Sequence, residues 1–306
     1  MSKKVILTCG DSWTFGSEII DPKLAKDEPK PYNLQEFINP NHKDYSSEND
    51  EYRLARIWPT YLGEMSGLEV INIAKPAISN RWILNTTIAW IMENYISVGK
   101  STEDLMVIIG WTSIVRREFL FNIDNQIVEK TLNPNGDFKY EDDDVKEFFK
   151  WYVLTTQPDY EGAYDFININ FELSNFCQKN GITCFCFNAL PEEHHVYEME
   201  RYYKDLNISR YIDSFKNITT TWDRNLHNEC KIKWEYVLDS SFYLKDRPLN
   251  SFANYIRMIP LNERLHGVHP SPIAHKMWAE ILYSWIFKVE DVYMDNIKKH
   301  QRKPLI

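Results

Sequence analysis

A short polar turn near the amino terminus carries the first group able to do chemistry. Gly10-Asp11-Ser12 directly follows residues 5–9, a run rich in β-forming side chains. A serine at the carboxyl end of a buried parallel strand lies where α/β proteins bind ligands, and the N–H groups beside it can stabilise an oxyanion. Gly-Asp-Ser triplets also form many ordinary turns. Ser12 is therefore a candidate nucleophile that needs a base to imply catalysis.

A candidate base, His269, lies at the other end of the chain. It belongs to the segment His266-Gly267-Val268-His269-Pro270, just before an apolar helical pattern. A loop leading from the last strand into the last helix can bring a histidine to the sheet edge that carries Ser12, as proton transfer requires. A single histidine could equally cap the helix or lie on the surface. The position of His269 relative to Ser12 favours a nucleophile and its base.

Short apolar runs alternate with helical patterns through the chain, which predicts the elements that position these residues. We expect strands at residues 5–9, 68–74, 104–111 and 182–190, with a weaker fifth at 234–238. We expect helices at residues 58–65, 79–95, 164–179 and 270–287. Alternating strands and helices predict a parallel sheet covered on both faces. The expected fold is a three-layer α/β/α sandwich around a flavodoxin-like, five-stranded parallel sheet.

The order of the motifs resembles the SGNH (GDSL-type) serine hydrolase family, in which GDS follows the first strand and DxxHP lies near the carboxyl terminus. Residues 72–80 (NIAKPAISN) are similar to its second block, and residues 109–113 (IGWTS) stand where its GxND block follows the third strand. The resemblance covers most of the chain. It implies hydrolysis of esters or acetyl groups through an acyl-enzyme, without a cofactor, by Ser12 and His269.

Three positions depart from the family pattern. Ala77 matches a glycine that gives an oxyanion-hole N–H, and Thr112 matches an asparagine that gives a third donor. The resemblance therefore implies a hole made by Ser12, Ala77 and Thr112, and loss of one donor typically costs ~10²- to 10³-fold in rate. His266 matches the catalytic aspartate but supplies no negative charge. Glu263 could replace that aspartate if its loop folds back, or His269 could lean on a backbone carbonyl.

These departures leave two functions open. The chain is an esterase or acetylesterase, or it is a catalytically decayed SGNH module with a structural or binding role, for example in a phage particle. The phage reading rests on similarity of its GDSWTFG and GWTS segments to phage-encoded sequences. Hydrolysis of a short aryl ester that depends on Ser12 would distinguish the two.

Four further residues beside the motifs are candidates for substrate binding: Trp13, Asn80, Trp111 and Arg116. The tryptophans could stack on sugar rings, which favours a glycan ester, but core packing explains them equally well. Arg116 could contact an anionic or hydroxyl-rich substrate, or it could open a solvated first turn of a helix.

Composition excludes several classes of partner. A net charge of −9 and a pI near 5.5 argue against nucleic-acid binding. Five cysteines without CxxC spacing, and His194-His195 without HExxH spacing, predict no metal site. The first residues lack a signal-peptide core, and no run approaches the ~18–20 apolar residues of a membrane span. We expect a cytoplasmic protein with no cofactor and no membrane partner, although assembly into a larger particle such as a virion would leave no such mark.

The length of 306 residues and 43% hydrophobic content fit one large domain over residues 1–306. Polar residues 17–57 and irregular residues 191–262 are expected as insertions, and residues 289–306 as an exposed tail. Both insertions join strand ends to helices, where loops commonly form binding sites. We therefore expect them to form a lid or interaction surface over Ser12.

Overall fold

The computed structural model describes residues 4–23, 47–114, 116–132, 143–155, 158–190, 251–256 and 269–289, together with residues 259, 263, 265 and 266. Its centre is a parallel sheet with the strand order β2-β1-β3-β6. The strands are β1 (Val5–Gly10), β2 (Glu69–Asn72), β3 (Leu105–Trp111) and β6 (Thr183–Asn188). The predicted parallel α/β sheet is therefore confirmed for four strands, at the predicted places. The fifth predicted strand, at residues 234–238, lies outside the described residues.

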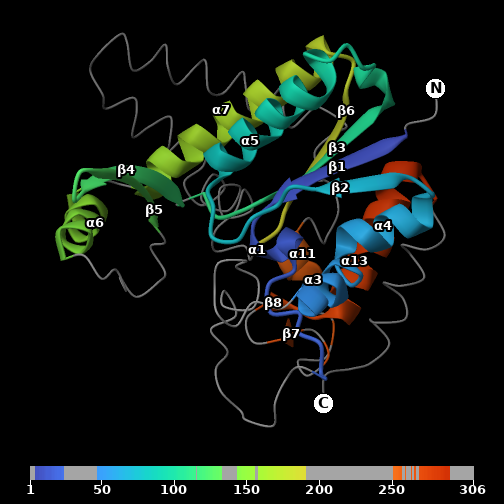
Figure 1. Cartoon of the computed structure of the whole chain (residues 1–306), viewed down its shortest axis with the longest axis horizontal. Helices are drawn as coiled ribbons and strands as arrows, with labels where there is room; N and C mark the ends of the chain where they lie inside the picture. Colours follow the sequence, from blue (N-terminus) through green and yellow to red (C-terminus); the bar gives the residue numbers. More distant parts are fainter. Residues whose placement is uncertain are drawn as a thin grey trace, which may run out of the picture.

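Helices cover both faces of this sheet (Figure 1). The path from β1 to β2 runs through α4 (Trp58–Ser66), and the path back from β2 to β3 runs through α5 (Asn80–Ile91). Because crossovers between parallel strands are right-handed, reversing direction along the sheet puts these two helices on opposite faces. The helix α7 (Pro158–Lys179) packs beside α5, and α13 (Pro272–Phe287) packs beside α4.

The ends of these helices carry typical capping residues. The α5 helix begins after Ser79, whose hydroxyl accepts the N–H of Trp82, and it continues into a π-helical turn (Met92–Ile96). The α13 helix begins after Ser271 in the same manner. Gly67 ends α4 with φ 68°, a left-handed conformation that glycine adopts without steric cost.

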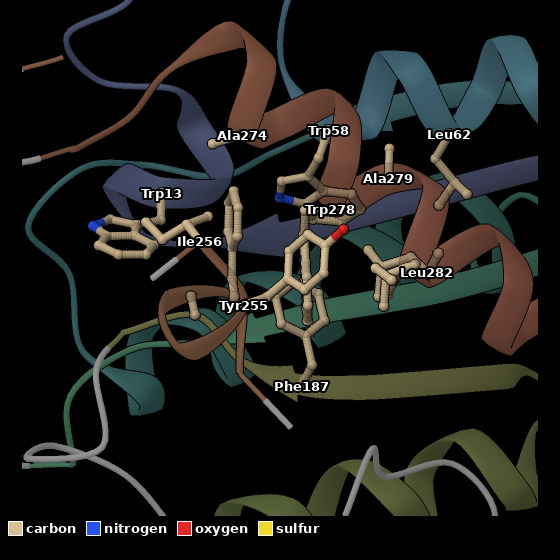
Figure 2. Close-up of a cluster of buried hydrophobic side chains, with 14 of the residues drawn as sticks. Trp13, Trp58, Leu62, Phe187, Tyr255, Ile256, Ala274, Trp278, Ala279 and Leu282 are labelled. Atoms are coloured by element: carbon tan, nitrogen blue, oxygen red, sulfur yellow. The ribbon is translucent and has the colours of Figure 1, made fainter. Parts of the chain in front are cut away.

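The two faces of the sheet carry separate hydrophobic clusters. Between the sheet and α5 and α7 the buried side chains are mainly aliphatic, with four cysteines among them. Between the sheet, α4, α13 and the short α11 (Phe252–Ile256) they are strongly aromatic, as Figure 2 shows for Trp58, Phe187, Tyr255 and Trp278. All seven residues of β3 are buried, as expected for a strand covered on both faces.

The carboxyl-terminal part of the predicted insertion at residues 17–57 is a helix. Residues Ser47–Leu54 form the helix α3, on which Asn49 and Arg53 are buried. Arg53 donates to the carbonyl of Phe15 and stacks over its ring at 3.8 Å, which ties α3 to the short α1 (Ser12–Phe15). The polar composition of this part of the segment did not indicate a packed helix, because its polar side chains make internal bonds. Residues 24–46 and most of the predicted insertion at 191–262 lie outside the described residues, as does the tail after residue 289.

Residues 116–155 contain elements that the sequence patterns did not predict. The strands β4 (Arg117–Ile123) and β5 (Gln126–Leu132) form an antiparallel hairpin that packs on α6 (Asp143–Thr155). At its tip Asp124 and Asn125 both have positive φ, as a two-residue hairpin turn requires. Because Arg117 begins a strand, the alternative of a helical first turn at Arg116 is wrong. In Figure 1 the hairpin and α6 project away from the central sheet.

None of the described helices is long and apolar enough to cross a membrane.

Candidate functional site

Ser12 lies at the carboxyl end of β1, where the strand order changes direction between β2 and β3. Open α/β sheets bind ligands at such points. The carboxyl oxygen Oδ1 of Asp11 accepts the N–H of Trp13, and the N–H of Gly16 closes the turn on the carbonyl of Ser12. The side chain of Thr14 packs down on Gly10 and Gly110, where an added Cβ would come within 2.2 and 2.7 Å of its hydroxyl. These contacts hold Ser12, which is 7% exposed, against the sheet edge.

His269 is brought to the same place from the end of the chain. It begins the two-residue strand β8 (His269–Pro270), which pairs with β7 (Leu265–His266), and β8 contacts α1 (Figure 1). The side chain of His269 is 17% exposed. The structure therefore brings the elements of the predicted nucleophile and base together, although they are far apart in the sequence. Their catalytic roles stay predictions.

A carboxylate that sequence reasoning missed lies against this histidine. Oε2 of Glu18 accepts the backbone N–H of His269 at 3.1 Å and lies 3.1 Å from its ring nitrogen Nδ1. The ring contact is not an aligned hydrogen bond in this state, and catalytic hydrogen bonds are commonly poorly aligned before substrate binds. Glu18 has φ 69°, a left-handed conformation that is rare for a non-glycine residue. No local pattern around Glu18 signals this contact, because its partner is 251 residues away.

The replacements considered from sequence for the family aspartate occupy other roles. Glu263 is exposed, and its carbonyl accepts a hydrogen bond from the hydroxyl of Ser271. His266 pairs with His269 through the main chain of the small hairpin. The described partner of the His269 ring is therefore Glu18, in place of Glu263 or a backbone carbonyl.

Ala77 adopts the backbone conformation that its match to a glycine implies. It has φ 59°, at a cost of about 1–3 kcal/mol for a residue with a Cβ, and it is exposed in the loop between β2 and α5. The N–H of Lys75 bonds the carbonyl of Gly10, which holds this loop beside the end of β1. Among the described residues, none accepts a hydrogen bond from the backbone N–H of Ser12 or of Ala77. Both N–H groups are therefore available as donors.

The hydroxyl of Thr112 is turned away from this role. Thr112 is fully buried, and its hydroxyl donates to Oδ2 of Asp11 at 2.7 Å while accepting from Nη1 of Arg116 at 2.8 Å. Nη1 of Arg116 also lies 3.2 Å from the same carboxylate oxygen. A buried carboxylate needs such partners, because desolvation of an unpaired charge costs several kcal/mol. Thr112 and Arg116 therefore serve Asp11 here, and the predicted third oxyanion donor is absent from this arrangement.

Asn80 is likewise committed to internal contacts. Its side chain accepts the N–H of Thr112 at 2.8 Å and donates to the carbonyl of Thr112 at 3.1 Å, and the residue is 4% exposed. These two bonds fasten the start of α5 to the end of β3. The geometry favours a structural role for Asn80 over substrate binding.

The predicted aromatic walls belong to the core. Trp111 is fully buried and meets Phe166 edge to face, with ring centroids 5.9 Å apart. Trp13, which Figure 2 labels, is 6% exposed. Its ring meets that of Phe252 edge to face, with centroids 5.4 Å apart. The structure favours core packing for both rings, so they give no support to a glycan substrate.

The projecting hairpin contributes one residue beside the site. Glu118 on β4 accepts hydrogen bonds from both the backbone N–H and the hydroxyl of Ser79, the residue that caps α5. Ser79 lies two residues after Ala77 in the same loop. Glu118 therefore stabilises the loop that contains Ala77.

Two of the buried thiols, those of Cys9 and Cys177, are poor candidates for nucleophiles. Burial raises the pKa of Cys9 to about 12, and the hydrogen bond with Cys184, together with burial, raises the pKa of Cys177. Such thiols stay protonated at neutral pH, whereas the thiolate is the reactive form. Within the part of the chain that the structure describes, no group of three or more His, Cys, Asp or Glu residues could hold a metal ion.

Comparisons with known proteins give one family match and several similar structures. A family model described as "Family of unknown function (DUF6071)" matches residues 36–221, a segment that contains Ala77 and Thr112 but neither Ser12 nor His269. No curated protein sequence matches this chain. The matches give no support for a phage source.

Three solved structures are similar over most of the chain. A putative lipolytic protein of the G-D-S-L family from Desulfitobacterium hafniense DCB-2 has 14% identity and a TM-score of 0.37, covering 92% of this chain and 99% of that one. A carbohydrate esterase whose active site displays divergent catalytic and non-catalytic binding functions has 11% identity and a TM-score of 0.42, covering 96% and 71%. The acetyl xylan esterase Est2A from the rumen bacterium Butyrivibrio proteoclasticus has 10% identity and a TM-score of 0.43, covering 95% and 66%. At this level of similarity they carry no information about the reaction, which has to be argued from the site.

Proposed function

The chain belongs to DUF6071, a family of unknown function, and we propose that it is a serine ester hydrolase of the SGNH type. Ser12 is the nucleophile and His269 the general base. The observation that carries this proposal is the contact of α1, which bears Ser12, with β8, which bears His269. Beside this contact the carboxylate of Glu18 lies 3.1 Å from Nδ1 of His269. A carboxylate at Nδ1 keeps the proton on that nitrogen and leaves the lone pair on Nε2 for the serine.

The reaction follows from these groups. Nε2 of His269 accepts the hydroxyl proton as Oγ of Ser12 bonds to the ester carbonyl carbon, and the carbonyl electron pair moves onto oxygen. As that pair returns, the bond to the alcohol breaks and His269 protonates the leaving oxygen. Water then attacks the acyl-enzyme with His269 again as base, and the acid leaves Ser12 free.

The oxyanion would be held by the backbone N–H groups of Ser12 and Ala77. Neither donates to another described residue, and the loop bearing Ala77 is held beside β1. Thr112 is not counted as a donor, because its hydroxyl is bonded to Asp11. One missing donor lowers the rate about 10²- to 10³-fold, so we expect a slower hydrolase than one with three donors.

The substrate class is proposed no more narrowly than a carboxylic ester. An acetylated glycan remains within that class, but the buried rings of Trp13 and Trp111 no longer favour it. The second candidate is a decayed module with a binding or structural role, and the engagement of the Thr112 hydroxyl by Asp11 is the observation in its favour.

Labelling with a fluorophosphonate tests the proposal, because this reagent reacts with an activated serine whatever the natural acyl group. We expect stoichiometric labelling of the wild type, none in Ser12→Ala, and a rate at least 10²-fold lower in His269→Ala. Ser17→Ala is the matched control, since Ser17 is also buried next to α1, and it should label like the wild type. An unlabelled wild type would refute the hydrolase and favour the decayed module. Where labelling succeeds, aryl acetates and acetylated polysaccharides would define the substrate.

A further inference from the structure

We propose that Glu18 is the positioning acid of this site, in place of the aspartate that the SGNH resemblance leads one to expect at position 266. The inference rests on the proposed function, because it assigns a role toward the base His269. Glu18 follows the nucleophile by six residues, whereas the expected aspartate precedes the histidine by three. The acid would thus come from the opposite end of the chain.

A single carboxylate oxygen lies against both the main chain and the ring of His269. Oε2 of Glu18 lies 3.1 Å from the backbone nitrogen, from which it accepts a hydrogen bond, and 3.1 Å from Nδ1. Contact with both atoms restricts the rotation of the imidazole about its first side-chain bond. The two side chains are only 15% and 17% exposed, so solvent screens their charges weakly. This geometry suits a group that stabilises the imidazolium formed during attack.

The chain path shows how Glu18 is delivered to this position. After α1, Gly16 has φ 83° and Glu18 has φ 69°, so two left-handed residues turn the chain back toward the site. The N–H of Ser17 bonds the carbonyl of Ser12. Beyond the turn, Ile19 is buried and its carbonyl accepts from the side chain of Asn49. Glu18 is therefore held between two fixed points.

The left-handed conformation of Glu18 is itself informative. Non-glycine residues persist in sparsely populated backbone regions only where the surrounding structure enforces them, and such residues gather at functional sites. Asn49 on α3 also accepts the N–H of Asp21, so α3 supports the segment that carries Glu18. We therefore infer that the start of the segment at residues 17–57 supplies the acid.

The first test compares labelling rates of Glu18→Gln and the wild type with a fluorophosphonate. Loss of the triad carboxylate should slow labelling about 10³- to 10⁴-fold. The control is Glu51→Gln, an exposed glutamate on α3, which should label at the wild-type rate. Thermal unfolding of both variants would verify that they are folded. Equal rates in Glu18→Gln and wild type would overturn the inference while leaving the hydrolase intact.

The second test reads the ring directly and does not depend on reaction. The ¹⁵N resonances of the His269 ring report which nitrogen carries the proton when the imidazole is neutral. The wild type should hold the proton on Nδ1, and Glu18→Gln should move the population toward Nε2. An unchanged tautomer in Glu18→Gln would refute the assignment of Glu18. A wild type with the Nδ1 proton but no labelling would instead refute the proposed function.

Discussion

Two carboxylates flank the nucleophile, and their surroundings differ sharply. Asp11, just before Ser12, is fully buried, and its partners Thr112, Arg116 and the N–H of Trp13 all belong to the interior of the fold. Glu18, just after α1, is partly exposed and reaches the ring of a histidine. A buried carboxylate whose partners are all internal holds the architecture, whereas one at a titratable ring can serve proton transfer.

The largest effect on stability is expected on the Asp11 side of this comparison. Asp11→Ala removes three hydrogen-bonding or ionic partners and leaves the largely buried Arg116 without its carboxylate. Breaking one half of such a pair costs about 3–5 kcal/mol, so the free energy of unfolding should fall by that amount. Urea denaturation measures it. Glu18→Gln, the comparison variant, should lose less than about 1 kcal/mol, and equal losses would erase the distinction between the two carboxylates.

A smaller effect, on the labelling rate, should appear when the carboxylate is moved to the position that the family resemblance predicts. The double variant Glu18→Gln/His266→Asp places a carboxylate three residues before His269, on the strand that pairs with it. We expect it to label with a fluorophosphonate at least about tenfold faster than Glu18→Gln alone, equivalent to about 1.4 kcal/mol of barrier. Adding His266→Asn instead provides the matched control. A gain in both double variants would show that charge is not the cause.

The smallest effect concerns the loop that carries Ala77. Ala77→Gly removes the Cβ from a residue at φ 59° and should relieve backbone strain in the folded protein. It should also raise the conformational entropy of the unfolded chain, which offsets part of this gain. We expect a net gain in the free energy of unfolding of at most about 1 kcal/mol, and unchanged or faster labelling because the N–H donor is kept. Ala89→Gly, in the regular interior of α5, should instead lose up to about 1 kcal/mol. A loss in both variants would argue that Ala77 is not strained.

Much of the scaffold was predictable from the sequence because its signals are local. The apolar runs identified β1, β2, β3 and β6. Ser79, Ser271 and Gly67 cap α5, α13 and α4, and they are residue types that commonly occupy such positions. The hairpin of β4 and β5 also left a local signal that was not used. Phe119, Phe121 and Ile123 alternate before the turn at Asp124 and Asn125, which is the period of a half-buried strand.

The sequence by itself placed Ser12 after the first strand and His269 before the last helix, since motif order and strand periodicity are written along the chain. Only the tertiary structure decided which way the neighbouring side chains turn. It buried Trp13 and Trp111 in the core and turned the Thr112 hydroxyl onto Asp11. It also set Glu18 against His269, a contact between residues 251 positions apart. Such pairings depend on where packing brings distant segments together, and neither composition nor local periodicity carries that information.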